Sequence, residues 1–225
     1  MDKLKRLERR LGYQFDNREL LQLALTHRSA GGSNNERLEF LGDSIVNHVI
    51  AESLYRQFPD MREGDMSRLR ASLVKGDTLA KLASELELGE CLQLGTGEKK
   101  SGGHRRGSIL ADALEAVAGA ILLDSDVETC RVCLLRWFNT RLQGLQPGSA
   151  EKDAKTQLQE FLQGRGKPLP TYQLVTIEGE DHQQHFEVSC LIHKPALTVQ
   201  GSGSSRRKAE QAAAAAALAR LENHG

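Results

Sequence analysis

The sequence predicts two domains of different class: an all-α N-terminal domain and a smaller C-terminal α+β domain. Residues 1–143 carry apolar side chains at helical spacing, and they contain no convincing strand pattern. Residues 144–152 include the stretch GLQPGS, whose composition is typical of a linker. Residues 153–225 then change pattern to a helix, three short strands and a final helix. The second domain is therefore predicted to follow the order α-β-β-β-α.

Length and composition are compatible with this division. The chain has 225 residues, of which 39% are hydrophobic, enough for two modest cores. Its 30 basic and 30 acidic residues cancel, so a nucleic-acid partner could be inferred only from local patches. No apolar run approaches the roughly 20 residues of a membrane span, and the first ten residues do not resemble a secretory signal. We therefore expect a soluble, cytoplasmic protein with no membrane partner.

Cysteine usage agrees with a reducing compartment. Cys130 and Cys133 are spaced like half a zinc site, but no second pair follows at a suitable distance. Together with Cys91 and Cys190, they are expected to be small, buried hydrophobic residues.

The helices of the first domain are each delimited by a glycine, a proline or a side chain that could cap them. Asp16 or Asn17 could cap the second helix, Asp65 the fourth and Ser108 the sixth. Phe58-Pro59 ends the third. The expected helices span 3–10, 20–24, 35–57, a charged segment from Asp65 toward Lys75, 79–88, 108–123 and 127–142.

Residues 94–107 form the most loop-like part of this domain. They contain four glycines and a cluster of basic or potentially basic side chains that includes Lys100, Arg105 and Arg106. The segment is either a flexible surface loop or a loop whose cations and accessible backbone N–H groups contact phosphates.

In the second domain, a helix is expected over 153–163 and strands over 172–177, 186–192 and 196–200. A long Ala-rich helix is expected over 204–221. Its alanine run, Ala212–Ala217, indicates a helix that packs closely against a sheet.

The stretch Asn35–Ser44, NERLEFLGDS, has an unusual polar face. Glu36, Glu39 and Asp43 lie within one narrow sector of a helix that turns about 100° per residue. Like charges one turn apart destabilise a helix unless something offsets their repulsion, and a bound cation would do so. The alternative is an acidic surface with no ligand.

Asp112 and Glu115 give the strongest local indication of a site. They are three residues apart on an otherwise apolar helix, with the small residues Ala116 and Gly119 beside them. Burying carboxylates without a partner is costly, so metal ligation is favoured. Together with Glu39 and Asp43 they make a set of hard oxygen ligands suited to Mg²⁺ or Mn²⁺ rather than zinc. Such a site suits phosphodiester hydrolysis.

The second domain indicates the substrate class. Ser204-Ser205-Arg206-Arg207-Lys208 lies at the start of the last helix, where side-chain cations and the helix dipole would face the same phosphates. Aromatic residues make up only 4% of the chain, which argues against base stacking on single strands. Recognition of an A-form duplex through its backbone and 2′-hydroxyls is favoured instead.

Three motifs and the second domain together resemble a known family. NERLEFLGDS at 35–44, SILADALEA at 108–116 and LTHRS at 25–29 are similar to bacterial ribonuclease III. The α-β-β-β-α unit with its GSGSSRRKAEQAAA ending resembles a double-stranded-RNA-binding domain. The resemblance covers nearly the whole chain. It implies a homodimeric, Mg²⁺-dependent endoribonuclease, with Mn²⁺ able to substitute and no small-molecule cofactor.

The resemblance also implies roles for individual residues. Glu39, Asp112 and Glu115 would bind the metal, Asp43 and Glu115 would be catalytic, and Glu36 and Glu63 would be supporting acids. The implied RNA contacts come from both domains: Lys100, Arg105, Arg106, Gln157, Glu160, His182, Ser205, Arg206, Arg207 and Lys208.

Further implications concern the products and targets. Each subunit would cut one strand of a duplex, leaving 5′-phosphate and 3′-hydroxyl ends with a short 3′ overhang. Expected targets are ribosomal RNA precursors, structured messenger RNAs and transfer RNA precursors.

The chain departs from the family pattern at a few positions. His104 and Gly107 stand where family members commonly have an aromatic and an acidic residue, and Ala154 stands where they have a proline. Glu210 stands where many double-stranded-RNA-binding domains have a lysine.

Two other functions remain open at this point. One is a duplex-RNA-binding protein that has lost cleavage and masks sites, against which the full acid set argues. The other is a small-molecule phosphohydrolase, which the attached RNA-binding unit disfavours.

Overall fold

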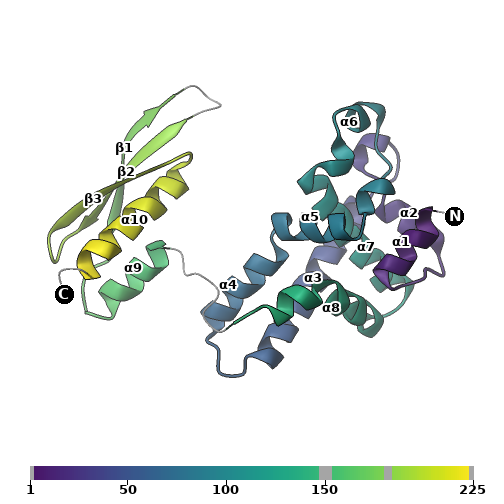
Figure 1. Ribbon diagram of the computed structural model, residues 1–225, viewed down its shortest axis with the longest axis horizontal. Helices are drawn as coiled ribbons and strands as arrows, with labels where there is room; N and C mark the ends of the chain where they lie inside the picture. Colours follow the sequence, from purple (N-terminus) through teal and green to yellow (C-terminus); the bar gives the residue numbers. More distant parts are fainter. Residues whose placement is uncertain (1–2, 147–153, 180–183, 223–225) are drawn as a thin grey trace. The chain divides into compact units, whose positions relative to one another are not determined.

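Helices form the first part of the chain and a small sheet with two helices forms the second (Figure 1). The computed structural model describes residues 3–146, 154–179 and 184–222. Contacts within the chain separate residues 1–150 from residues 151–225, and each unit has its own hydrophobic core. In the first unit the described residues form no strand, only an isolated bridge between Thr26 and Gln93. The predicted fold class is therefore confirmed.

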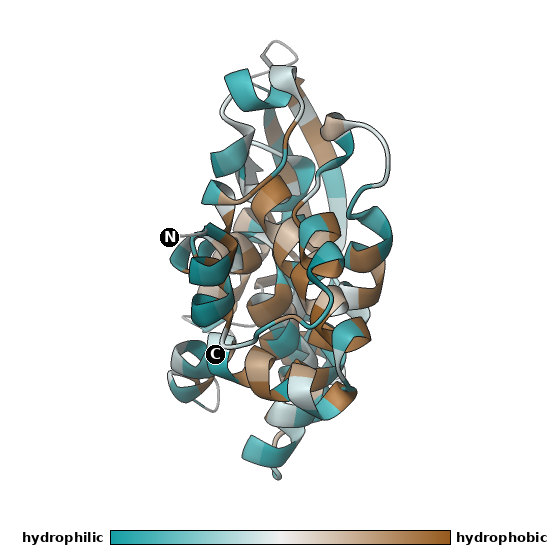
Figure 2. Cartoon of the chain, turned by 90° about the vertical axis from the view of Figure 1, so that its right-hand side faces the viewer, coloured by the Kyte–Doolittle hydropathy of each residue, from teal (hydrophilic) through white to brown (hydrophobic). Residues whose placement is uncertain are grey.

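The first unit is built around α7. The helices in chain order are α1 (Lys3–Leu11), α2 (Arg18–Ala24), α3 (Glu36–Gln57), α4 (Glu63–Val74), α5 (Gly76–Glu85), α6 (Thr96–Lys100), α7 (Gly107–Asp124) and α8 (Val127–Gln143). Eleven residues of α7 are buried, among them Leu114, Val117 and Ile121. Single helices carry both brown and teal bands in Figure 2, as expected when each has a buried and a solvent-facing side.

Two glycines let α3 and α7 approach closely. A Cβ atom on Gly42 of α3 would overlap the backbone carbonyl of Glu115, and one on Gly119 of α7 would overlap the carbonyl of Leu38. Side chains larger than hydrogen at these positions would force the helices apart. The backbone contact places the acidic faces of the two helices side by side.

Several expected helix bounds and caps are corrected by the structure. Asp65 does not cap α4, which begins at Glu63; it lies in the first turn and forms an ion pair with Arg68. Helix α5 spans Gly76–Glu85 rather than 79–88, because Asp77 occupies its first turn and Leu88 belongs to a separate 3₁₀ turn. Ser108 lies inside α7 and does not cap it.

Residues 94–107 are more ordered than a loop. They contain α6 and a 3₁₀ turn, Gly103–Arg105. The segment is held by Glu98, whose carboxylate accepts a hydrogen bond from Ser101 and forms an ion pair with Arg106 at 2.7 Å. The glycines predict a loop, but the contacts of Glu98 with Ser101 and Arg106 hold the segment in defined turns.

The second unit is a three-stranded antiparallel sheet in the order β1-β2-β3, with both helices on one face (Figure 1). Its elements are α9 (Ala154–Gln163), β1 (Thr171–Glu178), β2 (His185–Ile192), β3 (Leu197–Gly203) and α10 (Arg206–Glu222). Cβ atoms on Gly201 or Gly203 would overlap the backbone of α10. The expected close packing of the Ala-rich helix on the sheet is thus confirmed.

Two smaller expectations can be compared with the structure. Cys130, Cys133 and Cys190 are buried as expected, whereas Cys91 is only half-buried. Among the described residues, none of the helices combines the length and apolar character required to cross a bilayer.

Candidate metal centre and nucleic-acid surfaces

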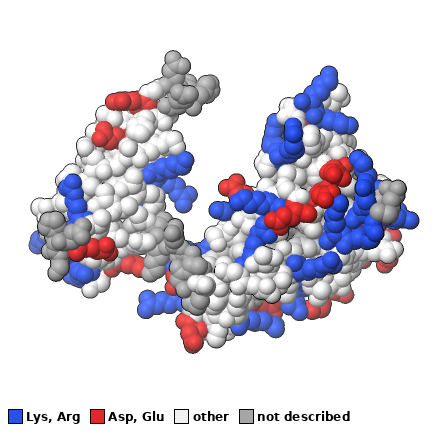
Figure 3. All heavy atoms as spheres, in the orientation of Figure 1, with Lys and Arg blue, Asp and Glu red and all other residues white. Residues whose placement is uncertain are grey.

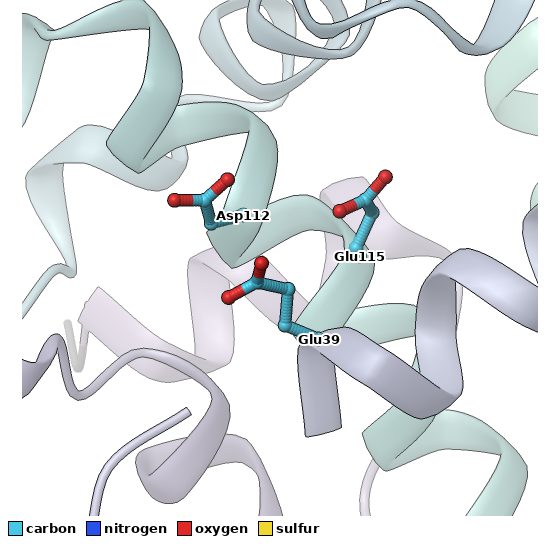
Figure 4. Close-up of side chains that lie close together, drawn as sticks. All are labelled: Glu39, Asp112 and Glu115. Carbon is cyan, nitrogen blue, oxygen red and sulfur yellow. The ribbon is translucent and has the colours of Figure 1, made fainter. Parts of the chain in front are cut away.

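Three carboxylates from two helices converge at the α3–α7 contact. One oxygen each of Glu39, Asp112 and Glu115 can be chosen so that all three lie within 4.8 Å of one another. Figure 4 shows Glu39 extending from α3 toward Asp112 and Glu115 on α7. All three side chains are half-buried. This is the only such group of potential metal ligands among the described residues.

The carboxylates lie in a cleft of about 710 Å³. On the visible face of the first unit, Figure 3 shows a red group of acidic side chains bordered by blue basic ones. Acids outnumber arginines in the lining, which also includes smaller polar and apolar groups. The lining residues are His27, Arg28, Ser29, Asn35, Glu36, Glu39, Phe40, Asp43, Glu98, Arg106, Ser108, Ile109, Asp112 and Glu115.

The electrostatics of the cleft favour a bound cation. Burial, followed by the negative charges of Asp43, Glu39 and Asp112, raises the pKa of Glu115 to about 8. Burial and neighbouring carboxylates also raise the pKa of Glu39, and burial raises that of Asp112. His27 and Arg28 partly offset the rise in the pKa of Asp112, and Arg28 partly offsets that of Glu39. A divalent cation between the carboxylates would remove the repulsion and favour their ionised forms.

Asp43 and Glu36 lie at the rim of the same cleft, and both are exposed. Asn47 Nδ2 donates a hydrogen bond to Asp43 Oδ1 at 2.8 Å, which fixes the direction of that carboxylate. Glu36 pairs with Arg28 at 3.7 Å. The structure therefore brings five of the six sequence-predicted acids together.

Glu63 is the exception within the chain. It lines a separate pocket between α3 and α4 with His48, Tyr55 and Arg70, and its Oε1 accepts a hydrogen bond from Ser67 at 2.7 Å. Helix α4 places Glu63 beside a part of α3 that begins about two and a half helical turns beyond Glu39, away from the other acids of its own chain. Its role as a supporting acid stays a prediction.

Some lining residues were missed by the sequence reasoning. His27 and Arg28 belong to the LTHRS motif. The spacing of residues within this motif does not by itself indicate that these two side chains line a site. Glu98 lies in the segment predicted to be a loop, where it is a single acid among several basic residues. Its ion pair with Arg106 places both side chains at the edge of the cleft.

The predicted RNA contacts fall on exposed parts of both units. Lys100, Arg105 and Arg106 are exposed on α6 or on the turn that follows it. In the second unit, Figure 3 shows basic side chains where α10 begins. Arg206, Arg207 and Lys208 are exposed, whereas Ser205 is half-buried and caps α10 by accepting a hydrogen bond from the Lys208 N–H at 3.3 Å. Gln157 and Glu160 lie on α9, and His182 lies outside the described residues.

Fold and site together define a helical domain with a carboxylate cleft, joined to an α-β-β-β-α domain that carries cations at its last helix. Comparison with known proteins agrees. The family model described as ribonuclease-III-like matches residues 17–142, and that of the double-stranded RNA binding motif matches residues 154–221. The chain is 60% identical to Ribonuclease 3 of Aliivibrio fischeri over 97% of its own length and 98% of that protein. The chain belongs to the ribonuclease III family.

Solved structures support the same assignment for the first unit. Two structures of the nuclease domain of ribonuclease III from Campylobacter jejuni resemble it, with identities of 41% and 42% and TM-scores of 0.62 and 0.60. They cover 65% and 61% of this chain, and the matches span 100% and 97% of those chains. The second is described as showing structural flexibility in a region involved in dimer formation of that Campylobacter protein.

Proposed function

We propose that this protein is a Mg²⁺-dependent endoribonuclease that hydrolyses phosphodiester bonds in double-stranded RNA. The observation that carries the proposal is the convergence of Glu39, Asp112 and Glu115 in one cleft of a ribonuclease III family member. A duplex-binding protein without activity would have no physical need for three mutually repelling, half-buried carboxylates. The second unit, with its double-stranded RNA binding motif, supports the choice of substrate.

The donor set fits a hard divalent cation. Glu39, Asp112 and Glu115 would hold Mg²⁺, with Mn²⁺ as a substitute, since both prefer oxygen ligands. A bound Mg²⁺ would lower the pKa of a water molecule and neutralise charge on the phosphate oxygens. Asp43, oriented by Asn47, is proposed to act as a catalytic acid–base group at the rim. Glu36 supports Arg28, whose guanidinium is available to attract the RNA backbone into an acidic cleft.

Two large apolar side chains support a homodimer. Phe40 and Tyr55 on α3 are 79% and 72% exposed in the single chain. Exposed aromatic residues of this size are typical of protein–protein interfaces. In the proposed dimer each subunit cuts one strand, which gives 5′-phosphate and 3′-hydroxyl ends with short 3′ overhangs. We further propose that the enzyme acts in the cytoplasm on precursors of ribosomal and transfer RNA and on structured messenger RNAs.

Cleavage of a perfect RNA duplex tests this proposal. With Mg²⁺ or Mn²⁺, the full chain is expected to produce discrete fragments, and with chelator it is expected to produce only a mobility shift. Fragments should accept a 5′ label from polynucleotide kinase only after phosphatase treatment, because their 5′ ends carry phosphate. A shift without fragments in either metal would instead favour a binding protein that masks RNA.

A further inference from the structure

Glu210 in the second unit holds two cations from two helices. Its Oε2 lies 2.7 Å from Lys155 Nζ of α9, and its Oε1 lies 3.0 Å from Arg206 Nε of α10. The Glu210 side chain is 15% exposed, whereas those of Lys155 and Arg206 are 35% and 61% exposed. The acid therefore lies beneath the two cations, and the cations face solvent.

Additional contacts fix Lys155 in this position. Its Nζ lies 4.4 Å from the centroid of the Tyr172 ring, a cation–π arrangement, and its backbone N–H donates to Gln211 Oε1 at 3.1 Å. The hydrogen bond from Lys155, followed by that from Arg206, lowers the pKa of Glu210. Glu210 therefore remains a carboxylate at neutral pH and keeps both partners.

The position of this cluster gives it a role. Arg206 opens α10, where Arg207 and Lys208 are also exposed, and an acid among cations that face RNA would by itself repel phosphates. Long flexible cations lose conformational entropy when they bind, and a fixed partner reduces that loss. The two ion pairs can therefore favour phosphate binding despite the negative charge that they include.

We propose that Glu210 is a positioning residue for duplex RNA, holding Lys155 and Arg206 together so that both contact backbone phosphates. The inference deepens the proposed function and rests on its duplex-RNA substrate. It adds Lys155 to the RNA-contacting residues. It also gives a role to an acid at a position where many double-stranded-RNA-binding domains have a lysine, since Glu210 holds a cation from α9 beside Arg206.

The test exploits the sign of the effect. E210Q removes a negative charge near RNA, so simple electrostatics predicts tighter binding, whereas loss of positioning predicts weaker binding. In chelator, with the full chain and a perfect RNA duplex, E210Q is expected to bind roughly two- to fivefold more weakly, as for loss of a partly exposed ion pair. The matched control is E222Q, an equal charge change at the exposed far end of the same helix, which should bind as tightly as wild type or slightly tighter.

Four further measurements test the positioning role and the folding of the variants. The slope of log K against log salt should become shallower in K155Q and R206Q, because each loses a phosphate contact. In the K155Q/R206Q background, E210Q should cause no further loss, because no cations remain to be positioned. With Mg²⁺, E210Q should raise KM and leave kcat unchanged. Thermal unfolding measured alongside establishes that each variant is folded at the assay temperature.

Different outcomes would overturn different statements. If E210Q binds as tightly as E222Q, Glu210 does not position these cations. If E210Q unfolds, K155Q carries the test, and unchanged affinity and salt slope in K155Q would overturn the inference. Failure of the wild-type chain to bind duplex RNA would instead overturn the proposed function itself.

Discussion

At the scale of single residues, Glu115 is the most electrostatically strained group in the cleft. Burial and three neighbouring carboxylates raise its pKa from 4.5 to about 8, so without metal it is largely protonated at neutral pH. The same repulsion that opposes its ionisation favours a divalent cation. Metal affinity and proton affinity at this residue therefore compete.

This competition predicts a pH-dependent stability difference between wild type and E115Q. Between about pH 4.5 and 8 the folded protein retains a proton on Glu115 that the unfolded chain releases, so wild-type stability falls as pH rises through this window. Glutamine removes that dependence. In chelator, the unfolding temperature of E115Q relative to wild type should therefore rise between about pH 5 and pH 8. Each kcal/mol of difference in unfolding free energy should change it by roughly 2–4 °C. Parallel unfolding temperatures across this range would contradict the raised pKa.

Residue identities were predictable where local spacing decided them. The three-residue spacing of Asp112 and Glu115 on an apolar helix identified that pair. The placement of Glu63 in another pocket depends on how α4 packs, which no local spacing reveals. The interaction of Lys155 with Glu210 joins residues from two helices far apart in the sequence and was likewise not visible.

At the scale of elements, the site depends on the close contact of α3 and α7. Glu39 reaches Asp112 and Glu115 because Gly42 and Gly119 allow backbone atoms of the two helices to meet. Overpacking a closely fitted contact typically destabilises by about 1–3 kcal/mol. The two glycines are therefore necessary for the convergence of the three carboxylates.

G42A should separate the acidic faces. Its methyl group would meet the backbone carbonyl of Glu115, so we expect a loss of roughly 1–3 kcal/mol in unfolding free energy and weaker metal binding. The control is G76A at the start of α5, where nothing lies within 4 Å of the added atom. Denaturant unfolding and metal titration check both variants. If G42A matches G76A in stability and metal affinity, the contact does not set the site.

Element types were more predictable than element ends. Helical spacing of apolar residues identified α3 and α7. The three strands were identified as short runs rich in Val, Leu, Ile and aromatic residues between turn residues. The predicted starts of α4, α5 and α7 differ from the observed ones, because the N-cap residue of none of these helices caps it with its side chain. Order in residues 94–107 comes from Glu98 and its contacts, which composition alone does not indicate.

At the scale of the whole molecule, two cores that share no residue predict separable roles. Deletion of residues 149–225 should leave a folded, dimeric nuclease fragment, since the first core lies within residues 1–142 apart from the partly buried Leu145. Cleavage should persist at low salt and fade at about 0.15 M, because phosphate contacts of the second unit are lost. Light scattering and cleavage assays check this. An insoluble or monomeric fragment would count against the proposed division at 144–152.

The central claim is that the Glu39–Asp112–Glu115 cluster is the catalytic metal centre of a duplex-RNA nuclease. Its most direct test compares duplex binding with single-turnover cleavage for E115Q across a Mg²⁺ titration, with E19Q on the exposed face of α2 as the matched control. E115Q should bind RNA like wild type but cleave it about 10³-fold or more slowly. This loss would exceed the roughly 10–100-fold loss typical of substitutions at groups that only hydrogen-bond to a metal ligand. Excess Mg²⁺ or Mn²⁺ should restore part of the rate. Near-normal cleavage by E115Q at low Mg²⁺ would contradict the assignment.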